Sequence, residues 1–328
     1  MSIETGITLQ INLAPTDLPH AKHILPHQLR QWAGQVDEVL LVVDMHRSRG
    51  RFAEGWEERL PGLRMLIEYC CARYSHARAQ EVDYSANIAA DVGDLFFGGQ
   101  PVPAKDCKGG PFYSYFFGLY AARHPYVFHM DSDMMYGGGS SYWLAEAVQL
   151  LRERTNVLIC SPLPGPPTAN GDLRSQSLER ESYTSLAFRS QSLSTRHFLI
   201  DKNRFSSTIK RLPLIQPSRL RTWQALAEGH PPCELPEVIF SRAMSDRNLI
   251  RIEFLGNDPG MWSIHPPYRS QLFYDRLPDI IQRVETGDIP EAQRGCHDIN
   301  GSLVDWTSAK KPGWRRVAKH IRLVLQRF

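Results

Sequence analysis

The sequence predicts an α/β protein in which a mostly parallel central sheet is flanked by helices. Residues 7–13 alternate apolar and polar side chains, which is typical of a strand, and residues 20–32 have the spacing of a helix that ends near Gly34. Residues 39–43 form a continuous branched apolar run, which is typical of a strand buried on both faces of a parallel sheet. The chain therefore opens with a strand–helix–strand unit whose second strand ends at Asp44.

Strands and helices continue to alternate through the middle of the chain, as expected for an α/β fold. Residues 111–120 begin with Pro and have the spacing of a helix, and residues 126–130 follow as a buried strand. An amphipathic helix is expected at residues 144–151 and a short strand at residues 156–160. The Pro-, Gly- and Ser-rich stretch 161–177 is predicted to be a loop.

The composition is that of a globular protein with a sizeable core. Of its 328 residues, 42% are hydrophobic and 22% are charged, and the formal net charge of +3 argues against nucleic acid as a partner. The six cysteines include no CxxC pair, and the sequence has no leader pattern and no apolar run long enough to span a bilayer. We therefore expect reduced thiols and a cytoplasmic protein.

The most informative residues are Asp131 and Asp133, which directly follow the predicted strand 126–130. In open α/β sheets, ligands bind beyond the carboxyl ends of the strands. Two carboxylates at this place suit Mn²⁺ or Mg²⁺, which is commonly bound by one or two carboxylates together with substrate phosphates. Such a pair is also frequent in solvated turns, so its position after a buried strand is what favours a metal site.

Four segments resemble GT-A glycosyltransferases, most closely the family-two-like inverting group. They are LLVVD, VFHMDSDMM, ELPEVIFSRAM and WSIHP, and the resemblance covers roughly residues 5–270. It implies a GT-A domain at residues 1–268, with a nucleotide-sugar half at 1–135 and an acceptor half at 136–268, and a C-terminal helical extension at 269–328. One departure is Pro236, which stands before Glu237 where the group usually has an acid.

The resemblance implies a UDP- or GDP-sugar donor in the first half of the chain. Asp44 is expected near the nucleoside, with Asp83 and Asp91 as alternatives, because a carboxylate there can accept hydrogen bonds from the base or the ribose. Asp131 is expected beside the donor as well as the metal. Lys108, which precedes two glycines, is a candidate for a phosphate contact, because glycine permits close backbone approach.

The remaining chemical roles fall in the second half of the chain. An inverting transfer needs a general base, and Glu237 matches the place of that base in the resembled group, with Glu234 as the runner-up. A glutamate in a first helical turn also complements the helix dipole, which is the alternative reading. His265 matches the late histidine that many GT-A enzymes bring to the metal, and His297 is a second candidate.

The last third is less regular, with helices expected near Trp223 and at residues 237–244. Residues 310–328 combine an apolar stripe with Arg and Lys, so this tail either contacts an anionic membrane or packs on the core. The acceptor is expected to be a glycan or a lipid-linked molecule. Two rival functions are a sugar nucleotidyltransferase, which would normally have a glycine-rich N-terminal loop, and a non-catalytic carbohydrate-binding protein.

Overall fold

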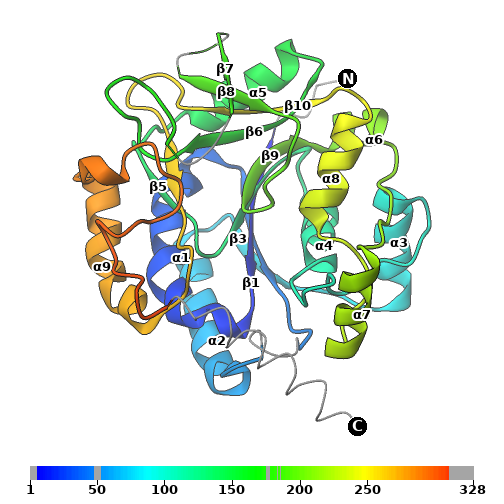
Figure 1. The fold of residues 1–328 in the computed structure, drawn as a ribbon. Coiled ribbons are helices and arrows are strands. Elements are labelled where there is room, and N and C mark those ends of the chain that lie inside the picture. Colours follow the sequence, from blue (N-terminus) through cyan, green and yellow to red (C-terminus); the bar gives the residue numbers. More distant parts are fainter. Residues whose placement is uncertain (1–5, 48–52, 175–177, 183, 185, 310–328) are drawn as a thin grey trace.

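The computed structural model describes residues 6–47, 53–174, 178–182, 184 and 186–309. Within these residues eleven strands form one sheet through the middle of the molecule, with helices on both faces (Figure 1). The order along the sheet is β3-β2-β1-β4-β9-β6-β10-β8-β7, and β11 pairs with β5 and β6. The bounds are β1 (Ile7–Leu13), β2 (Glu38–Val43), β3 (Ala77–Glu81), β4 (Tyr126–Asp131), β5 (Met135–Gly137), β6 (Val157–Pro164), β7 (Glu179–Glu181), β8 (Ala187–Ser190), β9 (His197–Asp201), β10 (Ile250–Phe254) and β11 (Trp262–Ile264).

Four neighbouring parallel strands bring the candidate acids to one edge of the sheet. β1 pairs in parallel with β2 and with β4, and β2 pairs in parallel with β3. Asn12 of β1 lies opposite Val42 on one side and Asp131 on the other. Because parallel strands end at the same edge, the chain after β2 and the chain after β4 leave the sheet on either side of the end of β1.

Strand directions confirm the predicted fold class, a mostly parallel central sheet flanked by helices. β9 runs antiparallel to both β4 and β6, so β6 and its parallel neighbour β10 run in the same direction as β1 to β4. Of the strands described, β5, β8 and β9 run the other way. The backbone N–H of Asp131 donates to the carbonyl of Arg196, 2.7 Å away, which ties the start of β9 to the acidic edge.

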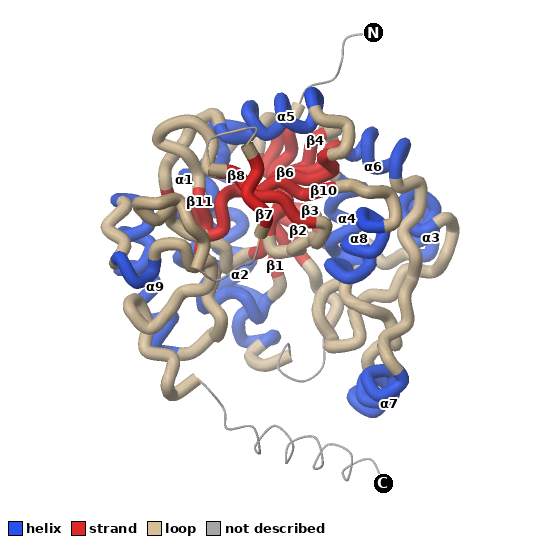
Figure 2. The backbone as a smooth tube through the Cα atoms, turned by 45° about the horizontal axis from the view of Figure 1, so that its top comes forward, coloured by secondary structure: helices blue, strands red, loops and turns tan. Residues whose placement is uncertain are grey.

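Helices cover both sides of the sheet (Figure 2), and their apolar residues form a separate core cluster on each side. One side is covered by α1 (Leu18–Trp32), α2 (Trp56–Arg73) and α5 (Trp143–Glu153), which share a core cluster with Leu9, Ile11 and Leu41. The other side is covered by α3 (Ala86–Phe97), α4 (Tyr113–Ala121), α6 (Lys202–Thr208) and α8 (Pro236–Ser245), with Leu40 and Val42 in their cluster. Successive residues of β2 thus serve opposite cores, as the two-residue period of a strand requires.

The chain after residue 268 packs back onto the first half. Helix α9 (Gln271–Thr286) places Phe273 and Leu277 in a third cluster that also contains Ile24 of α1 and Trp262 of β11. A short 3-10 helix follows at Glu291–Gln293. The predicted domain boundary between residues 268 and 269 stays a prediction, and the tail 310–328 lies outside the described residues.

The elements predicted in the first half agree closely with the structure, although α2, β3 and α3 were not predicted, and one expectation was wrong. β6 continues through Pro164, so the predicted loop at 161–177 begins with strand residues. Pro162 and Pro164 have no N–H to donate, yet Phe254 of β10 lies opposite Pro162, and Trp262 of β11 lies opposite Leu163. No helix in the described part of the chain has both the length and the apolar character that crossing a bilayer requires.

Candidate active site

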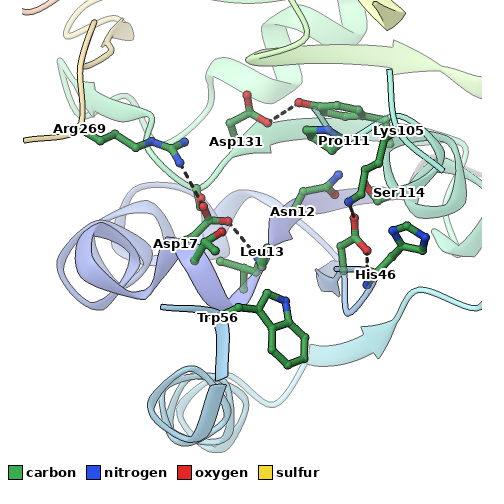
Figure 3. Close-up of a pocket in the computed structure, with 15 residues that line it drawn as sticks. Asn12, Leu13, Asp17, His46, Trp56, Lys105, Pro111, Ser114, Asp131 and Arg269 are labelled. Atoms are coloured by element: carbon green, nitrogen blue, oxygen red, sulfur yellow. Dashed lines mark hydrogen bonds and ion pairs between the residues drawn. The ribbon is translucent and has the colours of Figure 1, made fainter. Parts of the chain in front are cut away.

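A cavity of about 230 Å³ opens at the carboxyl ends of β1, β2 and β4 (Figure 3). Its floor is the end of β1 and the turn that follows, from Asn12 to Asp17, and its sides come from segments far apart in the chain. The residues that line it are Asn12, Leu13, Ala14, Thr16, Asp17, Asp44, His46, Trp56, Lys105, Pro111, Ser114, Tyr115, Asp131, Ser132 and Arg269. Of the sequence-predicted site residues, Asp44 and Asp131 line this cavity.

At one end of the cavity Asp44 forms a buried ion pair with Lys105. The Lys105 Nζ donates to Asp44 Oδ2 at 2.6 Å, and the two side chains are only 10% and 6% exposed. Asp44 Oδ1 accepts hydrogen bonds from the Tyr84 hydroxyl and from the backbone N–H of His46, both at 2.9 Å. A cation and an anion held beside an open space can recognise a polar, charged ligand there.

Asp83 and Asp91, the alternatives to Asp44 for a position near the nucleoside, do not line the cavity, and Lys108 does not line it either. Asp83 is exposed, and its carboxylate accepts the backbone N–H of Ser85 at 2.7 Å, which lowers its pKa. Asp91 lies on α3 and accepts from the Tyr120 hydroxyl at 3.1 Å. Lys108 is exposed on the loop after Lys105. The structure therefore points to Lys105 rather than Lys108 as the lysine of the cavity.

Asp131 presents its carboxylate to the cavity from the last position of β4. Its side chain is 25% exposed, and its Oδ1 accepts a hydrogen bond from the Tyr115 hydroxyl at 2.9 Å. Tyr115 comes from α4, whose Gly118 lies so close to Gln10 of β1 that an added Cβ would come within 2.1 Å of that side chain. The close approach of α4 to β1 is what brings the Tyr115 hydroxyl to Asp131.

Asp133 is buried two residues further on and is paired with Arg269. The Arg269 Nη2 and Nε donate to Asp133 Oδ2 at 2.8 Å and 3.1 Å, and Arg269 Nη1 donates to Asp17 Oδ1 at 3.2 Å. Burial alone would raise the pKa of Asp133, but the charges of Arg269 and His265 outweigh it and hold that pKa well below its ordinary value. Asp133 is therefore a carboxylate at neutral pH.

His265 lies between two carboxylates. Its Nε2 is 3.5 Å from Asp133 Oδ2 and its Nδ1 is 3.6 Å from Asp298 Oδ1, while its backbone N–H donates to the His297 carbonyl at 2.9 Å. Burial alone lowers the pKa of His265, but the two carboxylates outweigh burial and raise it. The structure thus joins three of the sequence-predicted residues, Asp131, Asp133 and His265, in one region, with the ring of His297 6.1 Å from that of His265.

The carboxylates of Asp131 and Asp133 are the groups of this region that could bind a divalent cation, although Asp133 Oδ2 is already paired with Arg269. Asp133 Oδ1 is buried and accepts no hydrogen bond from the described residues, and the partly exposed carboxylate of Asp131 belongs to the residue two positions earlier in the chain. Hard carboxylate oxygens suit Mn²⁺ and Mg²⁺. Within residues 6–309 as described, no group of three or more His, Cys, Asp or Glu side chains is clustered for a metal, so phosphate oxygens would have to complete the coordination.

Glu237 lies in the first turn of α8, half-buried, and does not line the cavity. Burial raises its pKa, the negative charges of Asp106 and Asp131 add to that shift, and Lys108 and Arg196 oppose it. Within the described residues its carboxylate accepts no hydrogen bond and forms no ion pair, whereas the Glu234 carboxylate lies 3.7 Å from Arg221 Nη1. Glu237 is thus the acid with the freer carboxylate near Asp131.

Sequence reasoning missed Lys105, Arg269, Tyr115 and Asp17. Lys105 lies six residues before the predicted helix at 111–120, and no local pattern relates it to Asp44. Arg269 follows Pro266, Pro267 and Tyr268 in an irregular stretch. Tyr115 lies within the predicted helix at 111–120, where its spacing indicates only an apolar face. Single arginine or lysine residues close to the segments WSIHP and LLVVD are a signal that could have identified Arg269 as a candidate.

No protein-family model matches this chain, and no curated protein matches it either. Solved structures with a distantly similar arrangement include residues 1–349 of S. aureus TarS, at 11% identity, with 88% of this chain and 68% of that chain covered and a TM-score of 0.41. The same TarS fragment is known in complex with UDP-GlcNAc. The mannosyltransferase PcManGT from Pyrobaculum calidifontis, in complex with GDP-Man and Mn²⁺, matches at 13% identity, covering 75% of this chain and 72% of that chain with a TM-score of 0.35. UDP-GlcNAc, GDP-Man and Mn²⁺ are ligands of those proteins, and this chain is similar to them only in how its backbone is arranged.

Proposed function

We propose that this chain is a metal-dependent glycosyltransferase that moves a sugar from a nucleotide-diphosphate sugar to a hydroxyl acceptor. The observation that carries the proposal is the cavity at the ends of β1, β2 and β4, with the Asp44–Lys105 pair at one end and Asp131 at the other. A nucleoside diphosphate has polar groups at one end and negative charge at the other. The Asp44–Lys105 pair offers hydrogen-bond partners to the first, and Arg269, together with a cation on Asp131, would meet the second. The donor is a UDP- or GDP-sugar.

In this proposal each residue has a defined part. Asp44, fixed by Lys105 and Tyr84, accepts hydrogen bonds from the nucleoside. Asp131 and Asp133 would hold Mn²⁺ or Mg²⁺, which offsets the negative charge that grows on the departing diphosphate. Arg269 already pairs with Asp133 and lines the cavity, so its guanidinium is placed to hydrogen-bond a diphosphate oxygen.

The chemical step that follows is an inverting displacement. The acceptor oxygen forms a bond to the anomeric carbon while the bond from that carbon to the diphosphate oxygen breaks, and the acceptor proton passes to Glu237. The raised pKa of Glu237 suits a base that must take a proton and release it afterwards. A glycan or a lipid-linked hydroxyl is the acceptor class, and the family-two-like inverting group remains the family that the sequence resembles.

A screen of donor hydrolysis tests this function, because many transferases slowly hydrolyse their donor when no acceptor is present. UDP-GlcNAc and GDP-Man are the first donors to try, each with Mn²⁺, with Mg²⁺ and with chelator. Metal-dependent release of UDP or GDP supports the transferase, and its loss in Asp131→Asn assigns it to this cavity. Binding of a nucleotide sugar with no turnover would instead favour a carbohydrate-binding protein. Release of pyrophosphate on forming a nucleotide sugar would identify a nucleotidyltransferase.

The two lysines give a matched test of the donor end. Lys105→Met should raise the dissociation constant for the donor by about tenfold or more, because the variant loses a buried charge beside Asp44. Lys108→Met should change it less than about twofold, since an exposed loop lysine is screened by water. Calorimetric titration with UDP and GDP measures both constants. A larger effect at Lys108 would return the phosphate contact to that residue.

His265→Ala should raise the Mn²⁺ concentration needed for half-maximal activity by about tenfold, as loss of a metal ligand or of its orienting neighbour does. The imidazole is 3.5 Å from Asp133 Oδ2, so its removal affects the metal whether it binds directly or orients the carboxylate. Activity is titrated with Mn²⁺ at saturating donor. An unchanged midpoint would assign His265 a structural role, and His297→Gln would be measured next.

A further inference from the structure

Residues 131–134, which include both candidate metal ligands, form a turn directly after β4. The backbone N–H of Met134 donates to the Asp131 carbonyl at 3.3 Å and closes the turn. Asp131 is its first residue and Asp133 its third, so the shape of the turn sets the spacing of the two carboxylates. The closing hydrogen bond is longer than the usual ~2.9–3.0 Å, so contacts from outside the turn are needed to fix its shape.

Gln28 of α1 makes two such contacts. Its Nε2 donates to the carbonyl of Asp131 and to the carbonyl of Met134, both at 2.9 Å. Because both partners are acceptors, the amide nitrogen must face them, which fixes the orientation of the side chain. Gln28 is 0% exposed, so water does not compete for these two hydrogen bonds.

His20, about two turns earlier on the same helix, contacts the side chain in the middle of the turn. Its Nε2 lies 3.0 Å from the Ser132 Oγ, and the imidazole is also 0% exposed. The ring of Tyr274 lies nearly parallel to the imidazole, at an angle of 16° with the ring centroids 6.5 Å apart. The imidazole is therefore held in one orientation while it hydrogen-bonds Ser132.

His27 extends the contact of α1 beyond the turn. The backbone N–H of Tyr136 in β5 donates to His27 Nε2 at 3.0 Å, so the ring proton is on Nδ1, which donates to Glu285 Oε1 of α9 at 2.7 Å. Seven and eight residues separate His20 from His27 and Gln28, which places all three along one stripe of the helix. Buried polar side chains cost free energy unless they are hydrogen-bonded, and each of these three bonds to residues 131–136.

We infer that His20 and Gln28 are positioning residues for the metal site, which they affect through the turn without touching the ion. Two carboxylates that share one cation repel each other when the cation is absent, so a turn with no outside support would relax and separate them. The hydrogen bonds from α1 oppose that relaxation and keep Asp131 and Asp133 near the geometry that a cation needs. The inference rests on the metal site of the proposed function and is independent of the sugar and the acceptor.

Mn²⁺ binding to the full chain tests this inference without a transfer reaction. The dissociation constant is measured from the loss of the free-ion EPR signal, for Mn²⁺ alone and with UDP or GDP. Gln28→Met keeps the length of the side chain and removes both hydrogen bonds, so it should raise the constant by about 10- to 100-fold. Gln35→Met is the matched control, because Gln35 Nε2 also donates to two carbonyls, those of Gln31 and Ser140, away from the turn. The control should bind Mn²⁺ within about twofold of the wild type.

The hydrogen bond between His20 and Ser132 provides a second test. His20→Phe and Ser132→Ala each remove one end of it, so their effects on the Mn²⁺ dissociation constant should not add in the double variant. His20→Gln should restore most of the affinity, because an amide can donate or accept a hydrogen bond in place of the imidazole Nε2. Melting curves without metal establish that each variant is folded, and this second test decides the matter if Gln28→Met does not fold.

Three results would overturn the inference. They are a Gln28→Met protein that melts at lower temperature but binds Mn²⁺ as the wild type does, a Gln35→Met protein that binds Mn²⁺ as weakly as Gln28→Met, and additive effects of His20→Phe and Ser132→Ala. A wild type that binds Mn²⁺ through Asp131 but hydrolyses no nucleotide sugar would instead overturn the transferase and leave the positioning role intact. A wild type that binds no Mn²⁺, alone or with either nucleotide, would overturn both.

Discussion

Glu237→Gln is expected to lower the rate of sugar transfer by ~10²–10⁴-fold, the contribution of a positioned general base. Donor affinity should stay within about twofold, because the proposed nucleotide and metal sites are at the cavity and Glu237 does not line it. The amide keeps the size of the side chain and removes its basicity. Turnover at saturating donor and calorimetric donor affinity together measure the two quantities.

The pH dependence of Glu237 provides a second readout. Burial raises its pKa, so the wild-type rate should rise as pH increases through a value above the ordinary range of glutamate, and the variant should lose that limb. A raised carboxyl pKa also means that ionisation destabilises the folded state as pH rises through this window. Glu237→Gln should therefore leave the melting temperature unchanged or higher at neutral pH, and unchanged at low pH.

Glu234→Gln is the matched control for this variant. Its carboxylate is 3.7 Å from Arg221, so the amide should weaken that contact with little effect on turnover. A Glu237→Gln protein that melts at lower temperature and turns over normally would show a residue that only complements the helix dipole, worth ~0.3–1 kcal/mol. A large rate loss in Glu234→Gln alone would move the base to that position.

Asp131→Asn and Asp133→Asn should each lower metal-dependent turnover by at least ~10²-fold, because each removes a charged ligand from the proposed metal site. The two should differ in stability. Asp131 is 25% exposed, so its amide should change the free energy of unfolding little. Activity in limiting Mn²⁺ and thermal unfolding distinguish them, and wild-type activity of both variants would place the metal elsewhere.

Asp133→Asn should also destabilise the fold by about 1–3 kcal/mol, because it removes the buried partner of Arg269, whose side chain is 38% exposed and partly screened. Arg269 and His265 hold the Asp133 pKa well below its ordinary value, so this stabilisation is present at neutral pH and is lost as pH falls below the ordinary range. The variant should therefore lose less stability on acidification than the wild type. Asp17→Asn is the control, because it removes the other carboxylate that Arg269 contacts and leaves Asp133, the proposed metal ligand, in place.

The first half of the fold could be predicted because its signals are local. The branched apolar run at residues 39–43 and the alternation at residues 7–13 became β2 and β1 within one residue at each end. The parallel register then brought Asp44 and Asp131 to one edge, as the rule for strand ends predicts. The position of these two residues beside one cavity thus follows from periodicity and a topological rule.

The rest of the site could not be predicted because its contacts are non-local. Lys105 approaches Asp44 from a loop 61 residues away, and Arg269 approaches Asp133 from 136 residues away. In the second half β9 runs antiparallel between β4 and β6, so its order in the sheet differs from its order in the chain. Such pairings depend on how elements pack, and hydrophobic spacing within a single segment carries no trace of them.

The contact of Arg269 with both Asp17 and Asp133 has a consequence for synthesis of the chain on the ribosome. Asp17 and Asp133 leave the exit tunnel long before residue 269, so any part of the sheet that forms earlier does so while Asp133 lacks this counter-charge. That carboxylate stays hydrated until the segment before α9 arrives. The site is therefore completed only after residue 269 has been synthesised, and an incomplete polypeptide that already contains both aspartates would still lack the arginine that lines the cavity.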